Sequence, residues 1–397
     1  MSPLDPATGY STGALQAALR ADIDSFIVMD IMREASALET SGRSVIHMEV
    51  GQPGTPAPRL ARAAVARALE CDTLGYTMAL GRDDLRARIS QHYHETYGVR
   101  VSPERVVVTA GSSAAFVLAF LACFDVGDRV LLPSPGYPCY RHILSALGQS
   151  SQLVQTGPAN RWMPQPEDVG RQAGACGAKG LLIASPANPT GTMLEPERLA
   201  ALVRVCGERG LWFISDEIYH GLTYGAAAQT ALAYSDEAIV INSFSKYFSM
   251  TGWRIGWMVV PDRLVRVIER LAQNLYISPP AVSQVAALAA FDAGEELEAN
   301  RAVYAANRAV LLDGLPRAGF GSIVPADGAF YLYADVSHLT DDSVALSRRI
   351  LHETGVAVTP GVDFDAARGA RFVRFSYARS TADMVEAVRR LTAWGRW

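Results

Sequence analysis

The chain is poor in cysteine and in long apolar runs, and both shortages limit what it can be. Its 397 residues include five cysteines, an odd number with no CxxC pair. This count does not suit a disulfide framework or a cysteine zinc site, and it predicts free thiols in a reducing, cytoplasmic location. The longest apolar candidate, residues 110–126, is too short to span a bilayer and reads as a buried helix. The first residues lack the apolar core of a signal peptide, so no membrane partner is expected.

An excess of charge of either sign is also missing. Lys and Arg total 36 against 40 Asp and Glu, a formal net charge of -4. This near balance argues against a nucleic-acid partner or a membrane-surface role. Metal-ligand spacing is absent too. His92 and His94 lie two residues apart on a predicted helix, so they point to different faces, and no metal site is expected.

The sequence does contain alternating buried-strand and helix patterns in a chain long enough for two domains. Apolar runs without in/out alternation, separated by helical stretches, predict an α/β fold with a mostly parallel sheet over residues 51–290. The expected strands are Arg105–Thr109, Arg129–Leu132, Gly180–Ala184, Leu211–Ser215, Ala238–Asn242 and Gly256–Val260. Residues 291–397 mix helices with shorter strands. Together with residues 1–50 they are expected to form a smaller α+β domain.

Polar side chains follow several of these strands directly. Lys246 stands in the segment Ser243–Gly256, and Arg254 comes eight residues after it. Asn188 follows another predicted strand, within Ala-Asn-Pro-Thr-Gly. Each feature has a simple structural alternative, because a lysine beside a serine-rich turn can be a surface charge and Asn-Pro often marks a tight turn.

Two further strand ends add to this set. Asp216 and Tyr219 follow one strand, although an aspartate there can also be a helix cap. Gly111, Ser112 and Ser113 form a turn before a long apolar helix, where backbone N–H groups and the helix dipole favour an anion. The carboxyl ends of strands are where open α/β sheets bind ligands. Together these groups match the needs of pyridoxal 5'-phosphate: an anion cradle with an arginine, a carboxylate for the ring nitrogen, donors for the phenolic oxygen and an amine.

The same segments resemble the class I/II aminotransferases, a family of fold-type I enzymes that depend on pyridoxal 5'-phosphate. The stretch Ser243–Gly256 fits the family's lysine signature at every fixed position. EVGQP at 49–53, ANPTG at 187–191, SDEIY at 215–219 and FVRFSYA at 372–378 follow the family's order. The resemblance spans nearly the whole chain. It implies an aminotransferase acting on amino acids and 2-oxo acids, and a homodimer with shared active sites.

The resemblance also implies a role for each matching residue around the cofactor ring. Lys246 would hold the cofactor as a Schiff base and then move the substrate proton. Asp216 would pair with the pyridine nitrogen, and Asn188 and Tyr219 would contact the phenolic oxygen. Tyr137, in SPGYPCY, would stack on the ring, unless it is only a core tyrosine.

The remaining roles concern the phosphate and the substrate. Gly111, Ser112, Ser113, Ser243 and Arg254 would hold the phosphate, and Tyr76 would reach the phosphate in the neighbouring subunit. A second group would bind substrate: Asn188, the backbone of Gly51, and Arg374, which would bind the α-carboxylate. An exposed strand arginine is the alternative for Arg374.

One departure bears on the substrate. Relatives selective for dicarboxylic substrates carry a cation near the anion cradle, where this chain has Ser113. The sequence therefore predicts that a neutral or aromatic donor is used at least as well as aspartate, unless Arg141, His142 or an arginine of the neighbouring subunit supplies the cation. Two other functions can be compared with this one. A β-lyase that cleaves C–S bonds could use the same scaffold. A transcription regulator would need a DNA-binding module ahead of residue 49, and the segment there is neither long nor basic.

Overall fold

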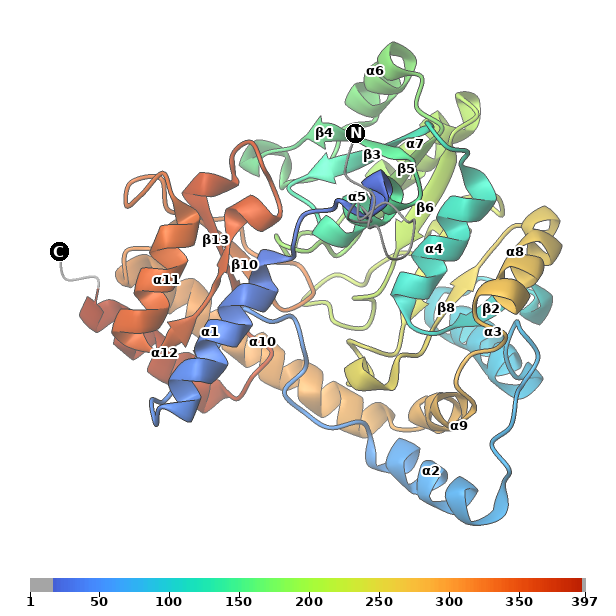
Figure 1. The fold of residues 1–397 in the computed structure, drawn as a ribbon, viewed down its shortest axis with the longest axis horizontal. Coiled ribbons are helices and arrows are strands. Elements are labelled where there is room, and N and C mark those ends of the chain that lie inside the picture. Colours follow the sequence, from blue (N-terminus) through green and yellow to red (C-terminus); the bar gives the residue numbers. More distant parts are fainter. Residues whose placement is uncertain (1–16, 395–397) are drawn as a thin grey trace, which may run out of the picture.

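The computed structural model describes residues 17–394 and places a seven-stranded sheet at the centre of the larger part of the molecule (Figure 1). Its strand order is β2-β8-β7-β6-β5-β3-β4. Strand β8 runs antiparallel to both of its neighbours, and the other pairs in this sheet are parallel. The strands are β2 (Val106–Thr109), β3 (Arg129–Ser134), β4 (Ser150–Gln155), β5 (Gly180–Ala184), β6 (Trp212–Asp216), β7 (Ile239–Ser243) and β8 (Gly256–Val259).

The sheet is buried on both faces, as its unbroken apolar strands require. Leu181 and Ile183 of β5 pack into one hydrophobic core, and Leu182 between them packs into another on the opposite face. The covering helices are α3 (Asp83–Tyr97), α4 (Ser112–Cys123), α5 (Pro138–Ala146), α6 (Pro166–Cys176), α7 (Pro196–Glu208), α8 (Asp262–Leu275) and α9 (Ala281–Ala290), and α2 (Arg59–Cys71) packs against α9. The predicted fold class, an α/β fold with a mostly parallel sheet, is confirmed.

A second, smaller unit surrounds another hydrophobic core. Its four-stranded antiparallel sheet has the order β12-β13-β10-β9, and β1 pairs in parallel with β11 beside it. The strands are β1 (Ile46–His47), β9 (Gly321–Ile323), β10 (Tyr331–Asp335), β11 (Val356–Ala357), β12 (Thr359–Pro360) and β13 (Phe372–Ser376). The helices are α1 (Ile27–Thr40), α10 (Gly294–Arg317), α11 (Ser343–Thr354) and α12 (Thr381–Trp394).

Helix α10 joins the two units, and Figure 1 shows it running from beside α9 toward the small sheet. Its Leu297 belongs to a core under the large sheet, whereas Leu311 and Leu315 belong to the core of the smaller unit. The domain limits expected from the sequence, 51–290 against 1–50 with 291–397, stay a prediction. Residues 1–16 and 395–397 of that expected small domain lie outside the described residues.

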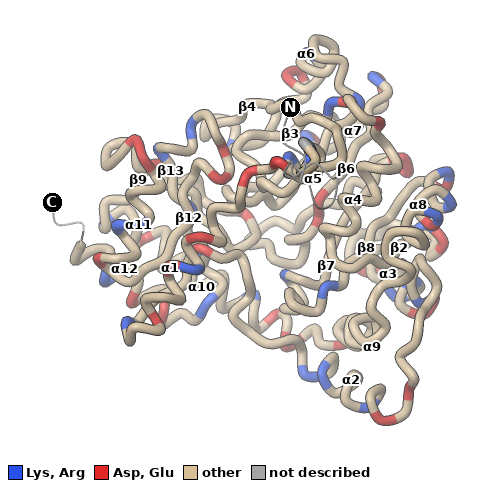
Figure 2. Tube along the Cα trace, in the orientation of Figure 1, with Lys and Arg blue, Asp and Glu red and all other residues tan. Residues whose placement is uncertain are grey.

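Acidic and basic residues are interspersed along the described chain, in line with its small net charge (Figure 2). Within residues 17–394, none of the helices is long and apolar enough to cross a membrane.

Candidate active site

A cavity of about 230 Å³ lies where β5, β6 and β7 end, beside the first turn of α4. Parallel strands bring their carboxyl ends to one edge of a sheet, so residues far apart in sequence meet there. Most of the predicted site residues line this cavity: Gly51, Ser112, Ser113, Tyr137, Asn188, Asp216, Tyr219, Lys246, Arg254 and Arg374.

Lys246 follows β7, and its amine reaches into the cavity. Nζ donates a hydrogen bond to the carbonyl of Gly51 at 2.7 Å and lies 6.0 Å from the ring centroid of Tyr219. Burial, and then the charges of Arg374 and Arg254, lower the pKa of this amine from 10.5 to about 8. A buried amine with a lowered pKa is a nucleophile near neutral pH. The surface-charge alternative for Lys246 is therefore excluded.

Asp216 ends β6 and is 3% exposed. Its Oδ2 accepts a hydrogen bond from the hydroxyl of Tyr140, and its Oδ1 accepts one from the backbone N–H of Ile218 at 3.1 Å. Burial raises the pKa of this carboxyl to about 6, while the two hydrogen bonds and the charge of Lys246 oppose the shift. A buried carboxylate held by two donors is ready to pair with a cationic group in the cavity.

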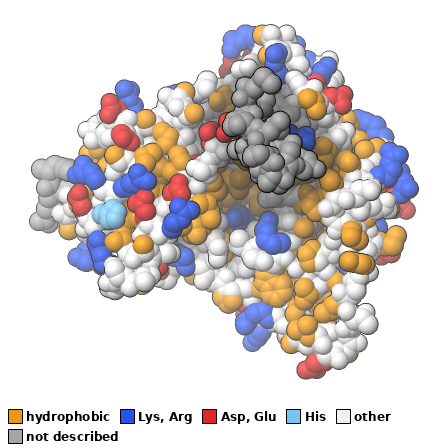
Figure 3. Space-filling model, in the orientation of Figure 1, with side chains coloured by type: hydrophobic (Ala, Val, Ile, Leu, Met, Phe, Trp, Pro, Cys, Tyr) orange, Lys and Arg blue, Asp and Glu red, His pale blue; other side chains and the backbone are white. Residues whose placement is uncertain are grey.

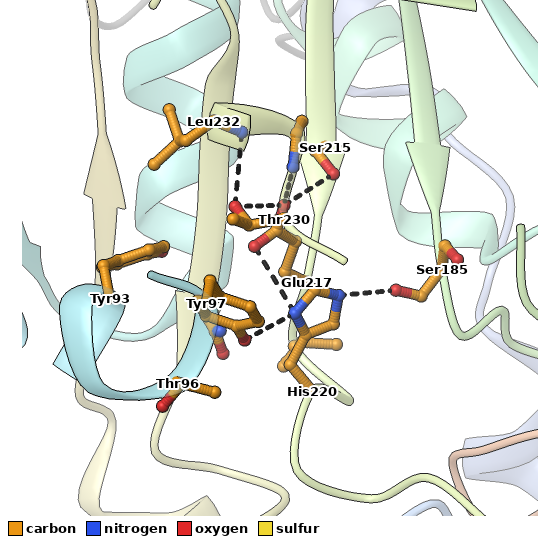
Figure 4. Close-up of polar contacts among 12 residues, drawn as sticks. Tyr93, Thr96, Tyr97, Ser185, Ser215, Glu217, His220, Thr230 and Leu232 are labelled. Carbon is orange, nitrogen blue, oxygen red and sulfur yellow. Dashed lines mark hydrogen bonds and ion pairs between the residues drawn. The ribbon is translucent and has the colours of Figure 1, made fainter. Parts of the chain in front are cut away.

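A buried polar network lies behind Asp216 and joins the ends of two strands (Figure 4). The neighbouring Glu217 accepts through Oε1 from Ser215, Thr230 and the N–H of Ala231. His220 lies beside it: Nε2 is 2.9 Å from the carbonyl of Ser185, and Nδ1 is 2.7 Å from the hydroxyl of Tyr97. A carbonyl only accepts, so Nε2 carries the hydrogen and Nδ1 of the neutral ring accepts from Tyr97.

This network fixes the turn after β5 relative to the end of β6. The turn after β5 begins at Ser185 and carries Asn188, and the end of β6 carries Asp216. Burial lowers the pKa of His220 to about 3 and raises the pKa of Glu217 to about 8, which favours the uncharged form of each near neutral pH. The two groups that face the cavity are thus supported from behind by hydrogen bonds.

The start of α4 and Arg254 together form an anion-binding corner. Gly111 precedes the helix with a φ of +79°, and a Cβ built on it would come within 2.4 Å of the guanidinium of Arg254. A Cβ on Gly256 would meet the backbone N of Ser112 at 3.2 Å. The two glycines therefore allow the arginine and the helix N-terminus to approach each other closely. The free N–H groups of a helix start and a guanidinium are a suitable pair for a phosphate.

Arg374 lies on β13 and is 3% exposed, so it is not an exposed strand arginine. It donates to Oδ1 of Asn188 at 2.8 Å, to Oγ1 of Thr359 at 3.1 Å and to the carbonyl of Glu49. Its guanidinium carbon stacks 4.4 Å above the ring centroid of Tyr331. Among the described atoms, its Nε is buried without a hydrogen-bond partner. A buried charge of this kind requires an anion, and a carboxylate fits the need.

Tyr219 and Tyr331 form the wall between Lys246 and Arg374. Their hydroxyl groups are 2.8 Å apart. A Cβ on Gly51 would come within 1.8 Å of the hydroxyl of Tyr331, so only glycine fits beside it. The missing side chain at position 51 leaves its carbonyl in contact with Lys246.

Three predicted residues do not line the cavity. Ser243 is buried below it and donates to the carbonyl of Ile255, whereas Ser245 lines the cavity in its place. Gly111 lies behind Arg254. Tyr76 is 85% exposed and lies on the surface.

The sequence reasoning missed several lining residues: Phe26, Val28, Met29, Val50, Gln52, Phe116, Tyr140, Ile218, Ser245, Thr251 and Tyr331. Two of these residues could have been predicted from their position in the sequence. Tyr140 lies three residues after Tyr137, where a helix brings its side chain to the same face. Ser245 stands directly before Lys246. No local pattern marked Phe26, Val28 or Met29, because their place depends on packing across the whole chain.

The profile of the family described as aminotransferase class I and II matches residues 43–391. A valine–pyruvate aminotransferase from Mycobacterium tuberculosis is 48% identical over 381 residues, 95% of this chain and 98% of that protein. An aspartate/prephenate aminotransferase from Thermus thermophilus is 33% identical over 362 residues, covering 90% and 92%. The crystal structure of an aminotransferase from Mycobacterium tuberculosis has a TM-score of 0.93 at 48% identity, covering 96% of this chain and 99% of that one.

The fold and the cavity are those of a fold-type I enzyme with a buried lysine at the end of a strand. The chain belongs to the class I and II aminotransferase family. It is an aminotransferase, and it moves an amino group between an amino acid and a 2-oxo acid. The family, the fold class and the enzyme activity expected from the sequence are confirmed.

Proposed function

We propose that this aminotransferase works with pyridoxal 5'-phosphate bound in the cavity and prefers neutral, apolar amino donors. The observation that carries the cofactor proposal is the meeting of a buried amine, a buried carboxylate and an anion-binding corner in one cavity. When bound, the cofactor supplies the carbonyl that carries the amino group and the ring that accepts the electron pair of Cα.

The residues present fit this group. Arg254 and the start of α4, with Ser112, Ser113 and Ser245 beside them, would hold the phosphate. Asp216 would keep the proton on the ring nitrogen, and Tyr137 would lie against the ring. Oδ1 of Asn188 is engaged by Arg374 at 2.8 Å. The amide NH₂ of Asn188 is then the group that donates to the phenolic oxygen, beside the hydroxyl of Tyr219.

The substrate would be held at the opposite end of the cavity. Arg374 lines the cavity and would bind the α-carboxylate through its guanidinium. Lys246 would then remove the proton from Cα, since its amine faces the centre of the cavity between Tyr219 and Gly51. Arg374 and Asp216 are almost fully buried, and the low dielectric around them strengthens their contacts with charged groups.

The preference for apolar donors follows from the rest of the lining. Phe26, Val28 and Met29 give the cavity an apolar wall. Among the described lining residues, the cations are Lys246, Arg254 and Arg374, and each has a role above. A distal carboxylate would therefore be desolvated without a partner, at a cost of several kcal/mol. The likeness to a valine–pyruvate aminotransferase supports the same choice.

The test uses purified protein reconstituted with pyridoxal 5'-phosphate and a panel of donors with pyruvate as acceptor. Alanine should form from pyruvate with valine as donor, and kcat/KM for valine should equal or exceed that for aspartate. Ammonia release with loss of the donor side chain would instead indicate a β-lyase. The donor preference would be contradicted if kcat/KM for aspartate exceeded that for every neutral donor by a hundredfold, about 2.7 kcal/mol.

We also propose a homodimer in which Tyr76 enters the neighbouring active site. Exposed apolar side chains lie on and after α2: Leu60, Leu69, Tyr76 and Met78. Figure 3 shows hydrophobic side chains gathered over α2 and α9. An apolar surface of this kind favours a protein partner, and two-fold dimers are the commonest assembly. The cytoplasmic location stays a prediction from the sequence.

A further inference from the structure

The first turn of α1 has no cap of its own. Phe26 occupies the position before the helix, and its side chain accepts no hydrogen bond from the first N–H groups. These groups instead donate to the carboxylate of Asp363, more than 330 residues later in the chain. The N–H of Ile27 is 3.2 Å from Oδ1, and the N–H of Val28 is 3.4 Å from Oδ2. A carboxylate there also interacts favourably with the helix dipole.

Asp363 is 1% exposed and is linked to the residues that would bind substrate. It ends a short turn, Gly361–Asp363, that follows β12. The next residue, Phe364, packs its ring against the guanidinium of Arg374, with 4.8 Å between the guanidinium carbon and the ring centroid. The carbonyl of Asp363 accepts from Arg141 of α5 at 2.8 Å. Asp363 does not line the cavity itself.

The turn held by Asp363 is the one that forms the apolar wall. Phe26, Val28 and Met29 line the cavity, and they flank the two N–H groups that the carboxylate binds. Phe26 also packs edge-on against Tyr137, with ring centroids 6.1 Å apart. Burial raises the pKa of Asp363, while the two N–H groups and the charges of Arg374 and Arg141 favour its ionised form.

We propose that Asp363 is a positioning residue that sets donor selectivity by holding this wall against the donor side chain. The inference rests on the proposed function, since it assumes that the wall faces the side chain of an apolar donor. Alanine extends only to Cβ and would depend little on the wall. Valine and phenylalanine reach further and would depend on it strongly.

The test is Asp363→Asn, which keeps the shape of the side chain but replaces one accepting oxygen by an NH₂ group. Steady-state kinetics should be measured in the reconstituted full chain with alanine, valine and phenylalanine and one fixed 2-oxo acid. We expect kcat/KM for valine and phenylalanine to fall roughly tenfold, mainly through KM, because a lost helix cap loosens the first turn. For alanine we expect a change below about twofold.

Asp365→Asn is the matched control. Asp365 is 2% exposed on the same segment, but its carboxylate binds Arg368 and the N–H groups of Ala367 and Arg368. Asp365→Asn should leave the ratio of kcat/KM for valine to kcat/KM for alanine unchanged. Phe26→Ala should lower the same ratio, and adding Asp363→Asn to it should have little further effect.

The outcomes separate the two proposals. Equal losses for all three donors in Asp363→Asn, or an unchanged valine-to-alanine ratio, would overturn the positioning role while the enzyme remains an apolar-donor aminotransferase. If the unmodified enzyme uses aspartate a hundredfold better than valine, the proposed donor preference fails first, and the role of Asp363 fails with it.

Discussion

The hydroxyl of Tyr140 donates a hydrogen bond to Oδ2 of Asp216, so a tyrosine to which the sequence assigned no role supports a proposed cofactor ligand. This bond lowers the pKa of Asp216 against the effect of burial. Tyr140→Phe should therefore raise that pKa further and weaken the hold on the ring proton. A hydrogen bond to a charged group contributes about 1.5–3 kcal/mol. We expect kcat to fall roughly tenfold to a hundredfold, measured with valine as donor.

Tyr93→Phe is the control for this change. Tyr93 is fully buried and its hydroxyl accepts from Trp257 at 3.1 Å, away from the cavity. It should lower stability slightly and leave kcat within about twofold. Comparable kcat losses in both variants would mean that Tyr140 acts only through packing.

Asp216→Asn should leave binding of pyridoxal 5'-phosphate largely intact but lower kcat by several orders of magnitude. A neutral amide does not keep the ring nitrogen protonated. Cofactor content can be read by absorbance and kcat by the same assay. Tyr140→Phe should add little in the Asp216→Asn background. Turnover near that of the unmodified enzyme would show that Asp216 is only the acceptor for the N–H of Ile218.

The amine of Lys246 should titrate near pH 8 in the cofactor-free protein, because burial and two arginines lower its pKa. Only the neutral amine attacks an aldehyde, so the rate of cofactor attachment should rise with pH and level off above about 8. At pH 7, roughly a tenth of the amine would be neutral. Stopped-flow absorbance can follow attachment, and borohydride reduction with peptide mapping can locate it. A midpoint near 10.5, or label on another lysine, would contradict the assignment.

Ser113→Lys should shift donor preference toward aspartate. A cation at this position of the cavity would pair with a distal carboxylate and offset its desolvation. We expect the ratio of kcat/KM for aspartate to that for valine to rise at least tenfold, about 1.4 kcal/mol. The uncharged Ser113→Met variant controls for bulk, and the ratio of donors cancels any change in cofactor occupancy. An unchanged ratio would show that the distal carboxylate lies elsewhere.

Mixing Tyr76→Phe with Lys246→Ala subunits tests the shared site. If Tyr76 serves the neighbouring subunit, each hybrid dimer contains one site with both the tyrosine and the lysine, and one site with neither. Activity per hybrid dimer should therefore reach about half that of the unmodified dimer. Hybrids limited to the activity of the Tyr76→Phe parent would mean that Tyr76 acts within its own chain. Sedimentation would contradict the proposal if it found an active monomer.

Much of this fold could be read from the sequence because buried parallel strands are unbroken apolar runs. The predicted strand Gly180–Ala184 matches β5 at both ends. The edge strand β4 was missed, because Ser150–Gln155 is mostly polar and carries no such signal. The motif residues at strand ends were found for the same reason, since each directly follows an apolar run. The sequence assigned to Ser243 the place beside the cavity that Ser245 occupies. The two serines are only two residues apart, and choosing between them requires the exact end of β7.

What the sequence could not supply was packing across long separations. Tyr331 lies far from Lys246 in the chain, yet it defines the space around Gly51. The first turn of α1 lines the cavity, and its N–H groups donate to a carboxylate more than 330 residues away in the chain. Neither relationship leaves a periodic or spacing pattern, since each is set by how the two units pack together.

The pairing of β1 with β11 has a consequence for synthesis on the ribosome. In the folded chain Ile46 pairs with Val356, and the carbonyl of Glu49 accepts a hydrogen bond from the hydroxyl of Thr359, 310 residues later. At about 5–20 residues per second, that interval is roughly 15–60 s. During this time the strands of the large sheet can emerge and pair, while Ile46 and the carbonyl of Glu49 lack the partners that they have in the complete fold. The carbonyl that contacts Lys246 is therefore among the last parts of the cavity to be fixed, and a nascent chain stalled before residue 356 would lack a finished site.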